Sequence, residues 1–372
     1  MERHVMKRKR LHRTNRIKGI AGCILLAAGF ALLFISRLSQ EFAHWYSTKV
    51  YPVWVGTSGR LMNLFPFSVS EVLLYIMIVI ILLSAGVLII KEVRRKAGKK
   101  EACSWGMGVF LLAASLFFLY VLNCGVNYHR ESFSESSGIQ VKDYTAGDLK
   151  EVCQWLTQKV NETSSQVERD QDGVMVLDIP MEKYAAEVMR SLGEEYPELA
   201  GYYPRPKGLL VPWILSIQNL TGVYSPFTVE ANYNSDMTAY NIPFTMCHEL
   251  SHLKGFMQEQ EANFIAWLAC SRAAAPEFRY SAALSGWLYA SNQLWKYDPS
   301  SYEELYGMLP ENARRDLAAN DAFWAKYEGK IAEVSNQIND AYLKSNGQEQ
   351  GVKSYDKMVD MLVVYVLDIL AE

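Results

Sequence analysis

One short stretch of the sequence holds residues whose types and spacing could carry out hydrolysis. It reads His248-Glu249-Leu250-Ser251-His252, with two histidines four residues apart and a glutamate after the first. Residues four apart lie on one face of an α-helix, so both imidazoles can reach a single Zn²⁺ ion. Glu249 can then take a proton from a water molecule on that ion. We therefore predict a zinc site with His248 and His252 as ligands and Glu249 as the catalytic base.

A third ligand should follow, because a catalytic zinc ion usually has three protein ligands and one open position for water. The run Glu259-Gln260-Glu261-Ala262-Asn263 supplies the candidates. Helical spacing places Glu259 and Asn263 on one face and turns Glu261 away from it. Glu259 is the ligand that this pattern favours, and Glu261 is the alternative.

These residues resemble the gluzincin metallopeptidases, in which a second helix carries a glutamate ligand within E-x-x-x-D or E-x-x-A-D. The resemblance implies that Glu259 is the ligand and that Asn263, at the aspartate position, orients the first histidine through a hydrogen bond. Asparagine is a departure, because it adds no negative charge. The short spacing from His252 to Glu259 is a second departure, and Gly255 could reverse the chain within it.

The string HELSHLKG also resembles the HExxHxxG motif of the metzincins. The third metzincin ligand would fall on Gln258, which is not a usual zinc ligand, so this assignment fails.

A wider part of the chain resembles an uncharacterised bacterial family of multi-pass membrane proteins, known only as a domain of unknown function. The shared features are three N-terminal spans and four motifs, which are P-F-T-x-E at 226–230, HExxHxxGF at 248–256, E-x-E-A-N-F at 259–264 and V-K-S-Y at 352–355. The resemblance implies this architecture and a zinc-peptidase activity, and it implies no substrate.

Three charge-free apolar segments precede the motif, at 19–36, 72–90 and 102–128. About 20 apolar residues in a helix cross the hydrocarbon core of a bilayer. We predict spans at about 19–37, 72–90 and 104–125, within a transmembrane region 19–128 whose partner is the lipid bilayer. The first run is longer than the apolar region of a signal peptide and lacks a clear cleavage site, so we expect an uncleaved anchor.

Basic residues indicate the orientation of these spans. The tail 1–18 has eight Lys or Arg, the loop 91–101 has six, and the longer loop 37–71 has three. The positive-inside rule places the first two in the cytoplasm and everything after the third span outside it. Residues 129–372 carry 20 basic and 35 acidic side chains, which argues against a nucleic-acid partner.

The remainder of the chain shows mostly helical periodicity. We predict a mainly α fold: three N-terminal transmembrane helices, a linker at 129–146, and a predominantly helical, gluzincin-like zinc-peptidase domain at 147–372 with a short β segment at 222–235. Residues 311–345 could form one helix or two. The aromatic-rich loop 38–68 could lie along the membrane interface or pack on the domain.

Several further side chains are candidates for other roles at the site. An oxyanion formed in the reaction needs a donor opposite the zinc, for which Tyr342 and Tyr355 are candidates on C-terminal helices. Glu230 and Asn232 could line the cleft or be exposed strand residues. Cys247 and Cys270 could form a disulfide, although buried thiols are the favoured interpretation.

The function that these features predict is a membrane-anchored zinc metallopeptidase that cuts a peptide or protein substrate on the extracytoplasmic side. One alternative is a degenerate zinc site in a membrane sensor or scaffold. Another is a hydrolase of a non-peptide amide of the cell envelope, since the same attack by water serves any amide.

Overall fold

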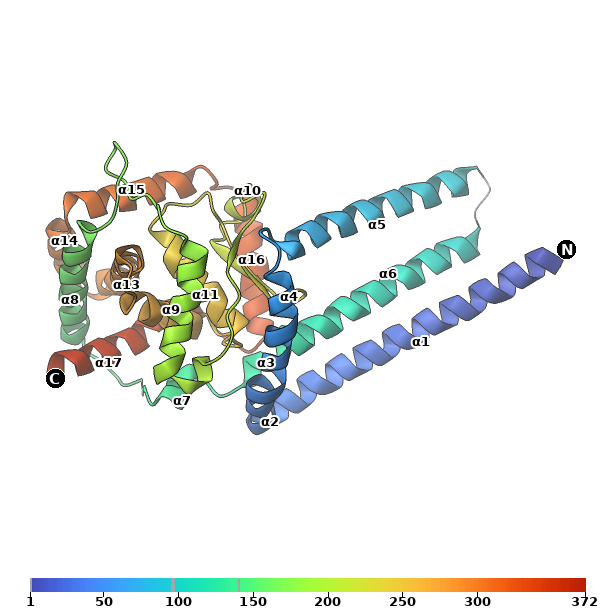
Figure 1. Ribbon diagram of the computed structural model, residues 1–372, viewed down its shortest axis with the longest axis horizontal. Helices are drawn as coiled ribbons and strands as arrows, with labels where there is room; N and C mark the ends of the chain where they lie inside the picture. Colours follow the sequence, from blue (N-terminus) through green and yellow to red (C-terminus); the bar gives the residue numbers. More distant parts are fainter. Residues whose placement is uncertain (1, 95–97, 140) are drawn as a thin grey trace.

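The computed structural model describes residues 2–94, 98–139 and 141–372, and their side chains except those of 2–10 and 354–356. The chain is mainly helical with one small sheet, as predicted. Figure 1 shows a helical domain at one end and three long helices that project from it on the same side. They are α1 (Glu2–Leu38), α5 (Val69–Val93) and α6 (Lys99–Tyr120).

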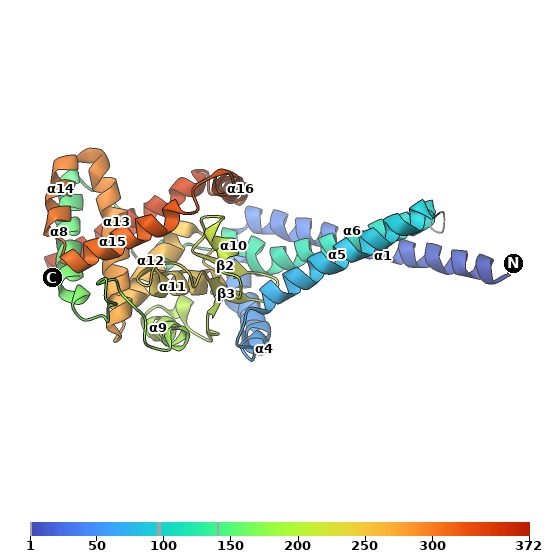
Figure 2. The same cartoon turned by 90° about the horizontal axis from the view of Figure 1, so that it is seen from above.

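These three helices carry the stretches that are long and apolar enough to cross a membrane, which are Leu11–Leu38, Val69–Val93 and Lys99–His129. The predicted spans lie inside these stretches. The chain runs toward the domain in α1, away from it in α5 and back to it in α6 (Figure 2). The N-terminal end of α1, the C-terminal end of α5 and the N-terminal end of α6 therefore lie far from the domain.

Helices α1 and α6 pack along each other (Figure 1). Glycines on α1 lie under large side chains of α6, with Gly19 facing Met107, Gly22 facing Phe110 and Gly29 facing Phe117. A side chain at these glycines would collide with its α6 neighbour, so the small residues allow the close approach.

A nearly continuous helical rod, residues 40–62, follows α1. It comprises α2 (Gln40–Trp45), η1 (Tyr46–Val50), α3 (Tyr51–Trp54), η2 (Val55–Gly59) and α4 (Arg60–Met62). Tyr51 is fully buried, and its hydroxyl lies 2.7 Å from that of Tyr224 and donates to the carbonyl of Leu253 at 2.8 Å. One face of the aromatic loop therefore packs on the domain, while Trp45 and Val53 remain exposed on the other.

The sheet has the strand order β1-β3-β2, with β1 (Lys207–Gly208) parallel and β2 (Gly222–Ser225) antiparallel to β3 (Glu230–Tyr233). Strands β2 and β3 form the predicted β segment. The sequence does not predict β1, because two residues show no periodicity. Strand β2 lies at one edge of the sheet.

The sheet holds the start of α5 through Glu230. Its carboxylate accepts from the amides of Val69 at 3.1 Å and Ser70 at 2.8 Å, and from Lys207 Nζ at 2.6 Å. A negative charge there complements the positive end of the helix dipole. Glu230 therefore anchors a membrane helix, and it is neither cleft-lining nor exposed.

The remaining helices form the domain. They are η3 (Val121–Gly125), η4 (Val126–His129), α7 (Phe133–Ser137), α8 (Ala146–Ser164), α9 (Met181–Glu195), η5 (Pro197–Leu199), α10 (Trp213–Ser216), α11 (Asn241–Leu253), α12 (Glu259–Ser271), α13 (Pro276–Tyr297), α14 (Pro299–Met308), α15 (Glu311–Ala325), α16 (Lys330–Ser345), η6 (Gly351–Lys357) and α17 (Met358–Ala371). Residues 311–345 thus form two helices.

The predicted linker at 129–146 is partly a docked segment. Within it, α7 places Phe133 in the core, against the rings of Phe256 and Phe264. The polar residues around Phe133 suggested a free linker, whereas burial of this single aromatic side chain fixes the segment to the turn and helix that follow the HExxH motif.

Candidate metal centre

The motif lies on α11, whose residues from Ile242 to Leu253 are all buried. The helix ends in a tight turn, in which Gly255 has φ of +96° and the amide of Phe256 donates to the carbonyl of Ser251. Glycine adopts this left-handed conformation without strain and commonly ends helices. The chain then reverses, and α12 begins at Glu259, as the position of Gly255 predicts.

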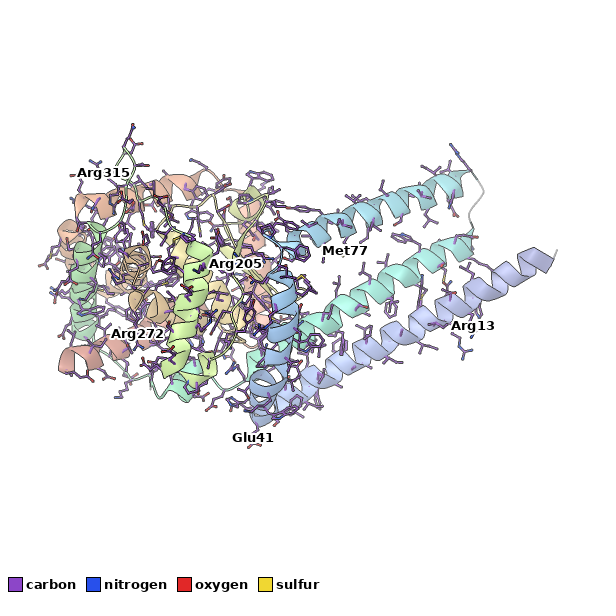
Figure 3. The ribbon with its side chains drawn as sticks, viewed as in Figure 1. Arg13, Glu41, Met77, Arg205, Arg272 and Arg315 are labelled. Atoms are coloured by element: carbon purple, nitrogen blue, oxygen red, sulfur yellow. The ribbon has the colours of Figure 1, made fainter. Side chains whose placement is uncertain are left out.

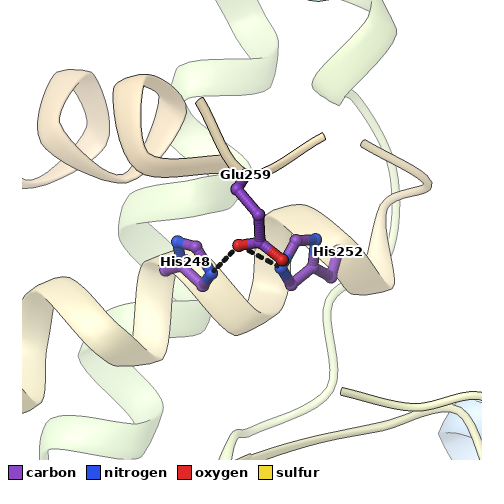
Figure 4. A group of neighbouring side chains, drawn as sticks. All are labelled: His248, His252 and Glu259. Carbon is purple, nitrogen blue, oxygen red and sulfur yellow. Dashed lines mark ion pairs between the residues drawn. The ribbon is translucent and has the colours of Figure 1, made fainter. Parts of the chain in front are cut away.

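This reversal brings the Glu259 carboxylate to both imidazoles (Figure 4). Its Oε2 lies 3.3 Å from Nε2 of His248 and 3.5 Å from Nε2 of His252. One potential ligand atom from each residue lies within 4.8 Å of the others, and all three side chains are buried. The structure thus brings together the three residues that the sequence proposes as ligands.

The hydrogen bonds around the cluster leave its inward-facing atoms free to bind a cation. Nδ1 of His252 lies 2.8 Å from the carbonyl oxygen of Phe256, which can only accept, so this nitrogen carries the proton. In the neutral imidazole, Nε2 of His252 is therefore the atom left to bind a metal ion, and it points at Glu259. Apart from its ion pairs with the two imidazoles, Oε2 of Glu259 accepts no hydrogen bond from the described residues. Two imidazole nitrogens and one carboxylate oxygen that converge in this way fit a Zn²⁺ ion.

Electrostatics keep Glu259 in the form that binds metal. Burial alone would raise its pKa, but the two imidazoles hold the pKa well below its usual range. Burial would lower the pKa of His252, and the Glu259 carboxylate more than offsets this, raising it to about 9. Burial lowers the pKa of His248. Glu259 is therefore a carboxylate at neutral pH, which is the form that binds metal.

Glu249 lies beside the cluster in a different environment. Burial raises its pKa to about 8, although the charge of His252 and a backbone hydrogen bond from Tyr224 lower it. Its Oε2 also has no hydrogen-bond partner among the described residues. An acid–base group with a pKa near neutrality suits proton transfer, and a cation next to it would shift this pKa downward.

Gly222 is a site residue that sequence reasoning missed. A β-carbon at this position would lie 2.5 Å from Oε1 of Glu249, so β2 packs directly against the carboxylate. A glycine at the start of a strand gives only a weak signal, because its role depends on a helix that follows later in the chain.

The cluster lies in a cleft of about 740 Å³. One side is formed by β2. Its lining also includes Cys124 and Tyr128, which follow α6, Tyr289 of α13 and Asn320 of α15. The cleft therefore joins the segment that follows α6 to helices of the domain.

Comparison with protein families gives one match, to a protein of unknown function (DUF3810), over residues 46–363. The chain belongs to the DUF3810 family. No curated protein and no solved structure gives a match. The DUF3810 match contains the whole cluster and begins inside the helical rod 40–62, so this rod, α5 and α6 belong with the domain in the family's unit.

The other predicted residues of this DUF3810 chain take varied positions. Asn263 lines the cleft, and its side chain acts to raise the pKa of His248, although Nδ1 of that histidine forms no well-aligned hydrogen bond with a described residue. Glu261 points away from the cluster, and its carboxylate accepts from the amide of Phe133 at 2.7 Å. Asn232 donates to the carbonyl of Val223.

Tyr342 lines the cleft, with its hydroxyl 3.2 Å from that of Tyr128. Tyr355 lies in η6, and its side chain is outside the described residues. Cys247 and Cys270 are buried free thiols.

Proposed function

We propose that this DUF3810 protein is a membrane-anchored, zinc-dependent metallopeptidase. The observation that carries the proposal is the convergence of His248, His252 and Glu259 on one point in a cleft, with the Glu249 carboxylate beside it. A zinc ion held there would polarise a water molecule and lower its pKa to about 7. Glu249 is placed to accept the proton of that water and to pass it to the leaving amine.

The lining of the cleft supports a polypeptide substrate. It includes seven asparagines, at positions 219, 241, 263, 292, 320, 336 and 339. Each amide side chain can both donate and accept hydrogen bonds, which matches the alternating groups of a peptide backbone. The edge strand β2 runs beside Glu249 and adds backbone groups to this wall.

We also propose that the domain is extracytoplasmic. The tail 1–18 and the loop 91–101 are rich in Lys and Arg. The N-terminal end of α1, the C-terminal end of α5 and the N-terminal end of α6 lie far from the domain, and Arg13 lies toward that end of α1 (Figure 3). Clusters of Lys and Arg next to membrane spans favour the cytoplasmic side. The domain at the opposite end then faces outward.

The test is hydrolysis of a mixed peptide library by the zinc-loaded full chain in lipid nanodiscs, read by mass spectrometry. Glu249→Gln is expected to keep the metal and to lower cleavage by about 10²- to 10⁴-fold, the usual contribution of a general base. Glu261→Gln is the matched control, because this buried glutamate faces away from the cluster, and it should retain cleavage. Undiminished turnover by Glu249→Gln would contradict the mechanism.

A further inference from the structure

We infer that the substrate of this cleft is a membrane-anchored polypeptide, which is cut in the segment where it leaves the bilayer. The inference rests on the proposed function and adds the class of substrate. It is carried by the position of the cleft relative to the apolar helices, by exposed apolar side chains beside the cleft, and by a lining that includes no Lys or Arg among the described residues.

The cleft begins where the third apolar helix ends. Helix α6 continues without a break into η3 and η4, and Cys124 and Tyr128 of these turns line the cleft. The Sγ atom of Cys124 lies 3.6 Å from the Sδ atom of Met257, which is two residues before Glu259. Since Cys124 follows the apolar pair Val121 and Leu122, the cleft starts within about one helical turn, roughly 5 Å, of the apolar run.

The first turn of α5 holds an apolar loop that contains Leu210 and Val211. The Glu71 carboxylate, in the first turn of α5, accepts from the amides of Leu210 at 2.7 Å and Val211 at 2.9 Å. Leu210 is 60% exposed and Trp213 53% exposed. A helix of 25 residues is about 37 Å long, against a hydrocarbon core of about 30 Å, so its first turn lies at the interface. Exposed Leu and Trp at that depth are typical of membrane contact.

The loop leads directly into the wall of the cleft. Residues 219–224, which follow α10, line the cleft, and Val223 on β2 is 41% exposed. The next lining residue, Pro226, has its carbonyl bonded to Asn123 of η3, and Phe227 beside it is exposed. The loop and the β2 region therefore carry exposed apolar side chains beside the cleft, at Leu210, Trp213, Val223 and Phe227, which we call the rim. Grouped exposed apolar side chains mark protein or membrane interaction sites.

The charges in the lining of the cleft favour a polypeptide over a phospholipid as the substrate. Among the described residues, the lining of the cleft includes no Lys or Arg. Phosphate groups are usually bound by Arg, Lys or a cluster of amides at a helix start. Asp321, a lining carboxylate outside the proposed zinc site, would repel an anionic headgroup. An uncharged peptide backbone meets no such cost.

The extent of the cleft completes the argument. Its lining includes residues of η3 and η4, which follow α6, the cluster itself, and residues of α13 and α15 in the domain. An extended chain rises about 3.3 Å per residue, so a segment that leaves the bilayer at the rim would reach the cluster within about ten residues.

The first arm of the test measures the depth of the rim in the full chain, in phosphatidylcholine vesicles that contain spin-labelled phosphatidylcholine. A fluorophore is attached at Leu210→Cys, in a chain that also carries Cys23→Ala and Cys103→Ala because the other four cysteines are buried. Met308→Cys is the matched control, with 57% exposure against 60% for Leu210, on α14 far from the apolar helices. At least twofold quenching at 210 and none at 308 is expected. Equal quenching at both positions overturns the inference.

The second arm compares a mixed peptide library coupled to a palmitoyl anchor with the same library left free, using the zinc-loaded chain in vesicles. Anchoring should raise the cleavage rate by about tenfold or more through effective concentration, with cuts within about ten residues of the anchor. Equal rates overturn the inference but leave the proposed function standing. No cleavage of either library, with wild type matching Glu249→Gln, overturns the proposed function itself. Release of lysophospholipid or fatty acid from the vesicles reassigns the cleft to lipid.

Discussion

The buried carboxylate of Glu259 faces the Nε2 atoms of His248 and His252, at 3.3 and 3.5 Å. Nδ1 of His252 is bonded to the carbonyl of Phe256, so Nε2 is the nitrogen that remains for a metal ion. A Zn²⁺ ion would replace the proton that His252 shares with Glu259 and would be held by all three residues.

Gly222→Ala tests how closely the edge strand supports the base. The added methyl group would overlap Oε1 of Glu249, so the carboxylate must move while the three ligands stay in place. We expect peptide hydrolysis to fall by about 100-fold, the cost of misplacing a reacting group by about 1 Å, with zinc content unchanged. Gly56→Ala is the matched control, because a β-carbon at Gly56 meets no atom within 4 Å. Equal activity of the two variants would show that β2 does not position Glu249.

At the scale of elements, the site depends on one turn and on two carboxylates that hold the start of α5. The turn at Gly255 sets α12 against α11. Glu230 of β3 bonds the first amides of α5, and Glu71 of α5 bonds the loop that follows β1; we call this pair the clamp. Strand β3 contacts α11 on the domain side. The apolar helix α5 and the HExxH helix are therefore both attached to one small sheet, which fixes the position of the cleft relative to α5.

Glu230→Gln tests this clamp. The substitution leaves the Lys207 ammonium buried without its carboxylate partner, and it also removes the charge at the start of α5. Loss of one partner of a buried ion pair costs about 3 to 5 kcal/mol of unfolding free energy. Denaturant unfolding in detergent should show this loss. Glu311→Gln, in an exposed pair with Arg315, is the control and should leave the midpoint unchanged. Equal midpoints would argue against the clamp.

Prediction from sequence succeeds where the pattern is local. The three apolar runs and the helical periodicity are confirmed, and the HExxH spacing with Gly255 leads to a cluster that the structure brings together. The contacts of Gly222, Glu230 and Phe133 were not predictable. Each depends on a partner far along the chain, and a single glycine, glutamate or phenylalanine in a polar run carries no periodic signal.

At the scale of the whole molecule, the domain includes residues that precede the second apolar helix. Tyr46, Tyr51 and Val55 of the rod 40–62 are part of the hydrophobic core, beside Tyr224 at the cleft. A domain that begins at residue 129, as the sequence predicts, would lack the rod and would expose the core surface that these three side chains cover. Burial of each such side chain contributes about 1.5 to 3 kcal/mol, so together they approach the total stability of an ordinary domain.

A fragment of residues 129–372 should therefore fail to form a stable monomer. We expect aggregation in size-exclusion chromatography, whereas the full chain in detergent elutes as a single folded species. In the full chain, Tyr51→Ala should lower the unfolding midpoint, while Val53→Ala on the exposed face of the rod should not. A monomeric fragment that unfolds cooperatively at the temperature of the full chain would show that the rod is dispensable.

The most direct measurement is the zinc content of the purified full chain after dialysis, determined by mass spectrometry of the metal, for wild type, Glu259→Gln and Glu261→Gln. We predict about one zinc per chain in the wild type and in Glu261→Gln, whose carboxylate faces Phe133, and a clear loss in Glu259→Gln. A folded wild type without zinc, or a Glu259→Gln variant that retains it fully, would contradict a metal centre built from His248, His252 and Glu259.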